Sequence, residues 1–178
     1  MGQYFKAVIL NKNKKTIIKW IFSHDFGSGL KLMEHSWIEN PFVKTFERLI
    51  HNNPKHVVWA GDYANKCKGL KTNVYSRCSD KNKVSKDDDN VYELSILDSL
   101  YIINHTKKEY VNKVNIPNND GWRIHPLPLL TCEGNGLGGG DYYSENGSDF
   151  IGTWARDLIS VSSECPDGYK EIRPNFLE

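Results

Sequence analysis

Two apolar segments near the N-terminus indicate the fold: Tyr4-Phe-Lys-Ala-Val-Ile-Leu10 and Thr16-Ile-Ile-Lys-Trp-Ile-Phe22. Both segments are rich in aromatic and β-branched residues, and Ile18, Trp20 and Phe22 fall on one face at a spacing of two. The Asn- and Lys-rich residues 11–15 between them are typical of a turn. The sequence therefore predicts an N-terminal β-hairpin.

Two helices are expected next. Leu30, Met33 and Trp37 recur at helical spacing and predict a short helix over 29–38. Asn40 before Pro41 suits the N-cap and first position of a second helix, which stops near 52–54.

The remaining pattern favours strands. A short buried strand is expected at 57–59, a second hairpin at 100–105 and 109–114, two strands at 149–154 and 157–162, and an extended piece at 169–176. The Pro-rich segment 125–131 is expected to be extended or an edge strand, because proline cannot donate to a central ladder. We predict a single α+β domain over residues 1–178, with a mostly antiparallel sheet and the two N-terminal-side helices packed on one face.

Composition narrows the class of protein. The chain has 178 residues and a formal net charge of +1, so a strongly basic nucleic-acid binder is disfavoured. The N-terminal apolar run is too short for a signal peptide, and no segment has the length of a membrane span. Because no secretory signal is expected, the four cysteines are predicted to be reduced thiols in a cytoplasmic protein. None of them forms a CxxC pair, and we expect no membrane partner, no cofactor and no metal.

Residues 65–90 are expected to form a polar surface insertion, in which 79–90 is a mobile loop. They contain few large apolar side chains and many lysines. A solvated insertion and a basic contact surface are both compatible with this composition.

The first candidate site combines His24 and Asp25 with Lys31, Glu34 and His35. The last three share a helical face at i, i+3 and i+4. Such a group can bind an anion or perform acid–base chemistry, with His24 or His35 as the base. A surface salt-bridge stripe is the alternative.

Two further candidates contain glycine followed by aspartate and tyrosine. Gly61 precedes Asp62 and Tyr63, where Asp62 is either a site carboxylate at a strand tip or a turn cap. A loop with five glycines within 134–140 carries Asn135 and is bracketed by Glu133 and Asp141. It is expected either to cradle an anion with its backbone N–H groups or to act as a flexible linker. If both tips lie on one rim, Asp62 and Asp141 form a carboxylate pair.

Arg156 lies between the two strands expected near the C-terminus. A guanidinium there can clamp a phosphate or carboxylate with two hydrogen bonds, or serve in a structural Arg–Asp pair. His24, His35 and Asp62 are the candidate catalytic residues, and catalytic turnover is left open.

Several motifs carry a family resemblance: Met1-Gly-Gln-Tyr4, His24-Asp-Phe-Gly27 through Trp37, Trp59-Ala-Gly-Asp-Tyr-Ala64, the glycine-rich loop and Trp154-Ala-Arg-Asp157. Together they resemble a family of hypothetical proteins from bacteria and their phages. The resemblance implies a bacterial or phage cytosol, so the expected location is the cytoplasm of a bacterial host cell, and it supplies no catalytic residues.

Two functions follow as hypotheses. The first is binding of a polar anionic, nucleotide-like ligand by the candidate residues, with sequestration or hydrolysis. The second is inhibition of a bacterial host defence protein, by contact through residues 65–90.

Overall fold

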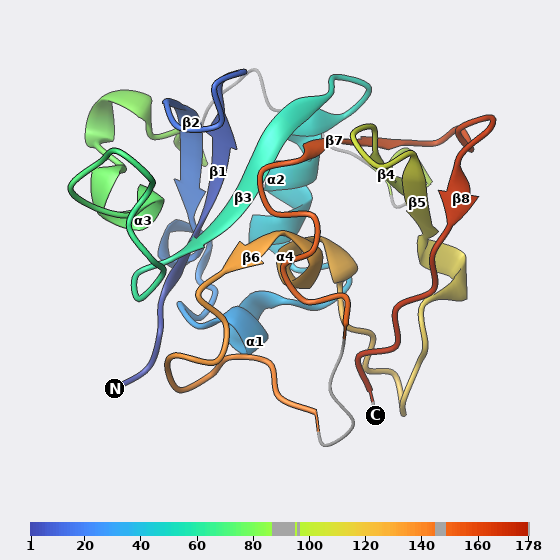
Figure 1. Ribbon diagram of the computed structural model, residues 1–178. Coiled ribbons are helices and arrows are strands. Elements are labelled where there is room, and N and C mark those ends of the chain that lie inside the picture. The colour runs from blue at the N-terminus through green and yellow to red at the C-terminus, as the bar shows by residue number, and fades with distance from the viewer. Residues whose placement is uncertain (87–94, 96, 145–148, 178) are drawn as a thin grey trace.

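The computed structural model describes residues 1–86, 95, 97–144 and 149–177. Its centre is an eight-stranded sheet in the order β2-β1-β3-β7-β4-β5-β8, with β6 also paired to β3. The pairs are antiparallel except β3–β6 and β5–β8. The predicted mostly antiparallel α+β class is confirmed (Figure 1).

The strands agree in large part with the expected ones. The N-terminal hairpin is β1 (Phe5–Leu10) and β2 (Ile17–Phe22), and the second hairpin is β4 (Tyr101–Asn104) and β5 (Glu109–Asn112). β3 (Lys55–Gly61) is longer than predicted and lies between β1 and β7. The others are β6 (Cys132–Glu133), β7 (Leu158–Ser162) and β8 (Lys170–Glu171).

Helix α2 (Pro41–Ile50) begins as predicted, because the Asn40 side chain accepts from the N–H groups of Phe42 and Val43. The predicted helix over 29–38 is only the single turn α1 (Leu32–His35). Beyond it the chain becomes extended, and Trp37 forms a β-bridge with Ile124. Residues 31, 34 and 35 do not share a surface face, because Lys31 and Glu34 are on the surface but His35 points into the core.

The extended structure predicted for 125–131 is wrong, because Pro126–Thr131 forms helix α4. His125 caps it by accepting from the N–H of Leu127. Both prolines lie in the first turn, where a backbone N–H would have no partner within the helix, so they do not interrupt it.

The strand predicted at 149–154 is also wrong, since these residues form turns. Gly152 has a φ of 69°, which a strand does not allow, and its N–H donates to the carbonyl of Leu129. The strand predicted at 157–162 is confirmed as β7.

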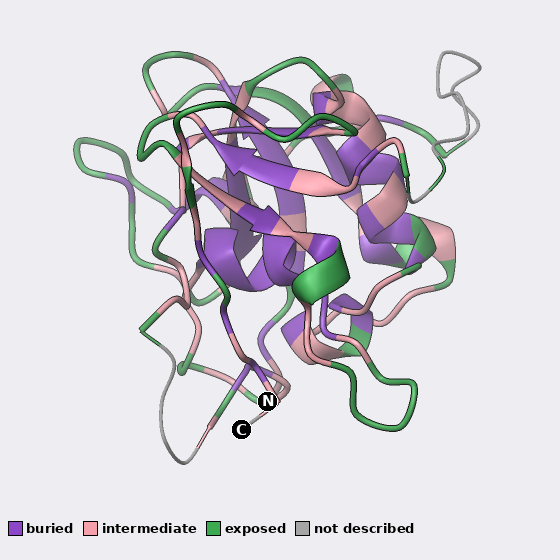
Figure 2. Cartoon of the chain, turned by 90° about the vertical axis from the view of Figure 1, so that its right-hand side faces the viewer, coloured by how far each residue is buried: buried purple, intermediate pink, exposed green. Residues whose placement is uncertain are grey.

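Both faces of the sheet are covered, so that successive residues of β3 enter different clusters. Val57 and Trp59 pack with residues of α1, α2 and α4, and Val58 and Ala60 pack on the opposite face. Figure 2 shows the buried residues gathered in the strands and the adjoining helices.

That opposite face is covered by the segment expected to be a surface insertion. It contains α3 (Val74–Arg77) and the 3-10 turns η2 (Asp80–Asn82), and it buries Cys67 and Val74. Asn82 donates to the carbonyls of Ile17 and Ile18, and Val84 N–H donates to Trp20. Residues 79–84 thus protect the open edge of β2; the rest of the expected loop, 87–90, lies outside the described residues.

Two short 3-10 turns, η1 (Ser23–Phe26) and η3 (Lys113–Asn115), complete the described secondary structure. The four cysteines are free thiols. Within the described part of the chain, no helix is both long and apolar enough to cross a membrane.

Candidate functional site

Among the predicted site residues, Arg156 has the side chain with the largest number of hydrogen bonds. Its Nε and Nη2 donate to the two carboxylate oxygens of Glu133, at 2.5 and 2.9 Å. Nη1 donates to the carbonyl of Lys14, and Nη2 also lies 3.2 Å from the sulfur of Cys67. The hydrogen bonds with Glu133 raise the pKa of Arg156, so the guanidinium is held in place as a fixed positive charge.

Two segments distant in sequence bring this pair together. Glu133 ends β6, where it pairs with Ala60 of β3, and the Arg156 N–H donates to the carbonyl of Val57. Arg156 has a φ of 65°, a left-handed conformation that a non-glycine side chain adopts at some cost. The expected Arg–Asp pair is therefore replaced by an Arg–Glu pair.

A cleft of about 400 Å³ opens beside this pair, which we call the Arg156 cleft. It is lined by Ala64, Asn65, Lys66, Cys67, Lys68, Glu133, Gly134, Leu137 and Arg156. Three lining side chains are cationic and one is acidic. Across the described residues, no carboxylate pairs with the ammonium of Lys66 or Lys68.

The glycine-rich loop does not offer its amides to an external anion, contrary to one prediction. The N–H groups of Gly136, Leu137 and Gly138 all donate to Oδ2 of Asp141, at 2.8 to 3.1 Å. Asn135 closes the same loop through two hydrogen bonds with the backbone of Tyr142. The chain's own carboxylate occupies the nest, so the loop is neither a cradle nor a slack linker.

Burial raises the pKa of Asp141 even though three N–H groups stabilise its charge, and the charge of Asp62 raises it further. Asp62 itself accepts from the N–H of Tyr4, and its own N–H donates back to the Tyr4 carbonyl. The two aspartates thus interact electrostatically, but each is bonded to a different backbone segment. Tyr63, beside Asp62, is exposed.

His35 is a core residue, which corrects its prediction as a surface acid–base group. It is fully buried, accepts at Nε2 from the indole N–H of Trp59 at 2.9 Å, and lies 2.9 Å from the carbonyl of Gly29 through Nδ1. Burial lowers the pKa of His35 to about 4. In the neutral ring both nitrogens are already hydrogen-bonded within the core, so neither can exchange a proton with a substrate.

Lys31 and Glu34 form the surface ion pair that was the alternative reading of this stripe. Their charged groups are 3.4 Å apart, and the Glu34 carboxylate also accepts from the Lys31 N–H. The stem of Lys31 lies against Gly2 and Gly140, where a Cβ would come within 2.5 and 2.2 Å of it. Lys31 is thereby kept out of the Arg156 cleft.

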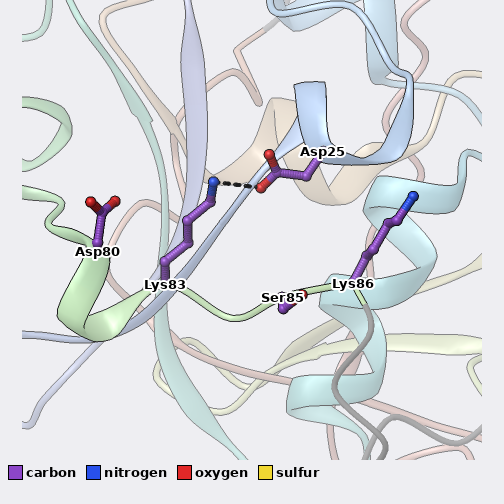
Figure 3. A pocket seen from close by; sticks show the side chains of 5 residues that line it. All are labelled: Asp25, Asp80, Lys83, Ser85 and Lys86. Carbon is purple, nitrogen blue, oxygen red and sulfur yellow. Dashed lines mark ion pairs between the residues drawn. The ribbon is translucent and has the colours of Figure 1, made fainter.

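His24 and Asp25 belong to a separate part of the surface. Asp25 forms an ion pair with Lys83 at 2.8 Å, in a pocket that Asp80, Ser85 and Lys86 also line (Figure 3). His24 contacts the ring of Phe22. Because two aspartates balance two lysines there, this pocket has no charge preference for an anion.

The structure therefore brings Glu133 and Arg156 together, beside the loop of Asn135 and Asp141, and separates them from His24, Asp25 and His35. Lys66, Cys67 and Lys68 were assigned to the insertion, and no local pattern places them beside Arg156. Only the tertiary contact between Arg156 and Cys67 does so.

A buried ionic cluster was also missed. Glu47, Lys113, His125 and Ser99 are each at most 3% exposed. Lys113 pairs with Glu47, and His125 Nε2 lies 3.1 Å from the same carboxylate oxygen. A helical projection of α2 could have identified Glu47. It lies four residues after Val43 and therefore on the same, buried face of the helix.

A buried amide without partners lies under the glycine-rich loop. Gln3 is fully buried, and neither its Oε1 nor its Nε2 has a hydrogen-bond partner among the described residues. Gly61 and Gly134 leave room for it, because a Cβ on either would lie within 2.2 Å of Nε2. An unsatisfied buried amide costs free energy that an apolar side chain of similar shape avoids.

Replacing Gln3 by methionine is therefore expected to raise the free energy of unfolding by about 1 kcal/mol. Asn135→Leu is the matched control and should destabilise, because the Asn135 amide has both of its hydrogen bonds. Urea unfolding of the two variants measures both effects. A Gln3→Met protein less stable than the parent would show that the amide has a structural partner.

The described residues contain no cluster of three or more His, Cys, Asp or Glu side chains that would hold a metal ion. Comparison with known proteins finds no matching family model, no matching curated protein and no matching solved structure. The function must therefore be argued from the site itself.

Proposed function

We propose that the protein binds a small anionic ligand of the nucleotide-like class in the Arg156 cleft. The observation that carries this proposal is charge: Lys66, Lys68 and Arg156 face one carboxylate, and that carboxylate is already bonded to Arg156. The two lysines are the cations left for a ligand to neutralise.

The form of the cleft supports the same ligand class. Its volume of about 400 Å³ lies within the usual range for small-molecule sites, roughly 300–1,000 Å³. Arg156 Nη1 has a second N–H beyond the one given to Lys14, and a guanidinium fixed by Glu133 loses little conformational entropy when it binds.

Binding or sequestration is better supported than hydrolysis. His35 is buried and neutral. Asp25 pairs with Lys83 in a separate pocket, and His24 packs against the ring of Phe22. Neither histidine lines the cleft, and the one carboxylate in its lining, Glu133, has both oxygens bonded to Arg156.

Inhibition of a host defence protein is the second candidate function. It was assigned to residues 65–90, but much of that segment covers the sheet or lines the cleft. A protein-contact function is better supported by another surface, described below. The bacterial or phage setting stays a prediction from the sequence resemblance.

Thermal unfolding with nucleotides, cyclic dinucleotides and inorganic pyrophosphate tests the main proposal. A ligand at about 100 times its Kd should stabilise the protein by about 2.7 kcal/mol. Lys66→Ala/Lys68→Ala should weaken this binding at least about tenfold, which corresponds to about 1.4 kcal/mol.

Lys170→Ala is the matched control, because Lys170 is an exposed lysine on β8 at the far edge of the sheet. It should bind the ligand as the parent does. Equal loss in both variants, or no stabilisation by any anion in the panel, would contradict the proposal.

A further inference from the structure

An apolar groove lies at the end of the sheet where β1 finishes and β3 begins. Its volume is about 640 Å³, and its lining includes five aliphatic or proline residues: Ile9, Leu10, Ile18, Pro54 and Leu158. Ile18 is 46% exposed, so part of this apolar surface is open to solvent. Burial of such surface by a partner is favourable by about 25 cal/mol per Å².

The rim of the groove is basic. Lys12, Lys55 and His56 line it together with Asn11, and the lining contains no acidic residue. The sequence segments 1–24 and 48–61, which supply all of the lining except Leu158, contain no Asp or Glu. Asp157, next to Leu158, is buried and accepts from Asn104. A segment that fills the groove therefore meets two lysines and no carboxylate in the lining.

The described strand edges at the groove are paired or covered. On β2, the edge strand that carries Ile18, the carbonyls of Ile17 and Ile18 accept from the Asn82 side chain. β1 pairs with β2 on one side and β3 on the other, and Lys55 and His56 of β3 pair with Ile159 and Leu158 of β7. A partner consequently cannot extend the sheet here, and recognition must come from side chains.

The floor also discriminates between classes of partner. It is aliphatic, and the one aromatic ring in the lining is the imidazole of His56 on the rim, which is held 3.0 Å from the Arg156 carbonyl. The lining contains no Phe, Tyr or Trp on which successive nucleobases could stack, which disfavours single-stranded nucleic acid. We propose that this groove docks a short acidic segment of a partner protein, with aliphatic side chains on the floor and carboxylates beside Lys12 and Lys55.

The test uses a fluorescein-labelled peptide of alternating Glu and Leu, nine residues long, in anisotropy titrations with the full chain. The parent protein should bind it and should bind a Glu–Ser or a Lys–Leu peptide at least about tenfold more weakly. Ile18→Asp should lose at least about tenfold in affinity. Val114→Asp is the control, because Val114 is 68% exposed in η3, outside the groove.

Charge reversal provides the second arm. Lys12→Glu/Lys55→Glu should prefer the Lys–Leu peptide, whereas Lys170→Glu should keep the parent's preference. Lys66→Ala/Lys68→Ala should bind the Glu–Leu peptide normally, which separates this inference from the proposed function.

Three results would overturn the inference. One is equal affinity of the Ile18→Asp and Val114→Asp proteins for the Glu–Leu peptide. Another is competition by oligothymidine with tighter binding than the peptide, which would indicate nucleic acid. The third is a dimer in light scattering that Ile18→Asp abolishes while the peptide does not bind, which would indicate a second copy of the chain.

Discussion

Glu47→Ala is expected to destabilise the folded protein by about 3–5 kcal/mol, because it leaves the buried ammonium of Lys113 without its counterion. For a domain of this size, the midpoint of thermal unfolding should fall by roughly 10 °C. Chemical and thermal denaturation measure the effect directly.

The cluster around Glu47 explains the size of this effect. Burial alone would raise the pKa of Glu47, but Lys113 and His125 lower it to about 2. Lys113 Nζ also donates to Ser99 Oγ at 2.9 Å, and Ser99 donates to the other oxygen of Glu47. Removal of the carboxylate therefore leaves several buried donors unpaired.

Two comparisons make the Glu47 prediction specific. Lys44→Ala, on the same helix, breaks the surface pair with Glu39 and should cost less than about 1 kcal/mol. Glu47→Leu/Lys113→Met removes both charges and should recover most of the loss. If the single and double variants are equally unstable, lost packing rather than the unpaired charge is responsible.

Acidification from about pH 6.5 to about pH 4 is expected to lower the free energy of unfolding by about 3 kcal/mol through His35. Burial lowers its pKa from 6.5 to about 4, and each pKa unit corresponds to about 1.4 kcal/mol. Because the folded-state pKa is the lower one, the unfolded chain binds the proton first. This contribution is complete above pH 6.5 and is lost as the pH falls toward 4.

His125 acts in the same direction, since burial lowers its pKa as well. Leu127 N–H donates to its Nδ1, so the proton of the neutral ring is on Nε2 and is given to Glu47. Glu47 adds a separate acid loss below about pH 4.5, because its folded pKa is also depressed.

Urea unfolding at a series of pH values, followed by tryptophan fluorescence, tests the His35 contribution. Protonation of His35 removes the acceptor for the Trp59 indole N–H. His35→Gln keeps a donor and an acceptor without a titrating ring, so its stability should fall less over this pH range. An unchanged pH profile in His35→Gln would exclude His35 as the source.

Elements specified by neighbouring residues were predictable. The N-terminal hairpin follows from alternation around a polar turn, and α2 follows from Asn40 and Pro41. Both signals act within a few residues, so they do not depend on the rest of the fold.

The errors have physical causes as well. Pro126 and Pro128 suggested an extended chain because proline has no N–H to donate within a sheet. A first helical turn does not need that N–H either, and both prolines lie in the first turn of α4. Phe150 and Ile151 are apolar, but Gly152 turns the backbone at a positive φ, and they pack against the core from a turn. Composition alone did not distinguish a proline-containing helix from an extended segment, or an apolar turn from a strand.

The α+β class, the two hairpins and the start of α2 could be predicted from the sequence. The three-dimensional structure was needed to place Lys66 and Lys68 in the Arg156 cleft, to show that the Asp141 carboxylate occupies its own glycine-rich loop, and to bring Glu47 against Lys113. Local backbone preferences are set by adjacent residues, whereas the contacts of Arg156 with Glu133 and Cys67 and of Glu47 with Lys113 join residues 23 to 89 positions apart and depend on how the whole sheet packs. Asp141 bonds to N–H groups only three to five residues away, but the backbone conformation that turns them toward its carboxylate is not specified by a run of glycines.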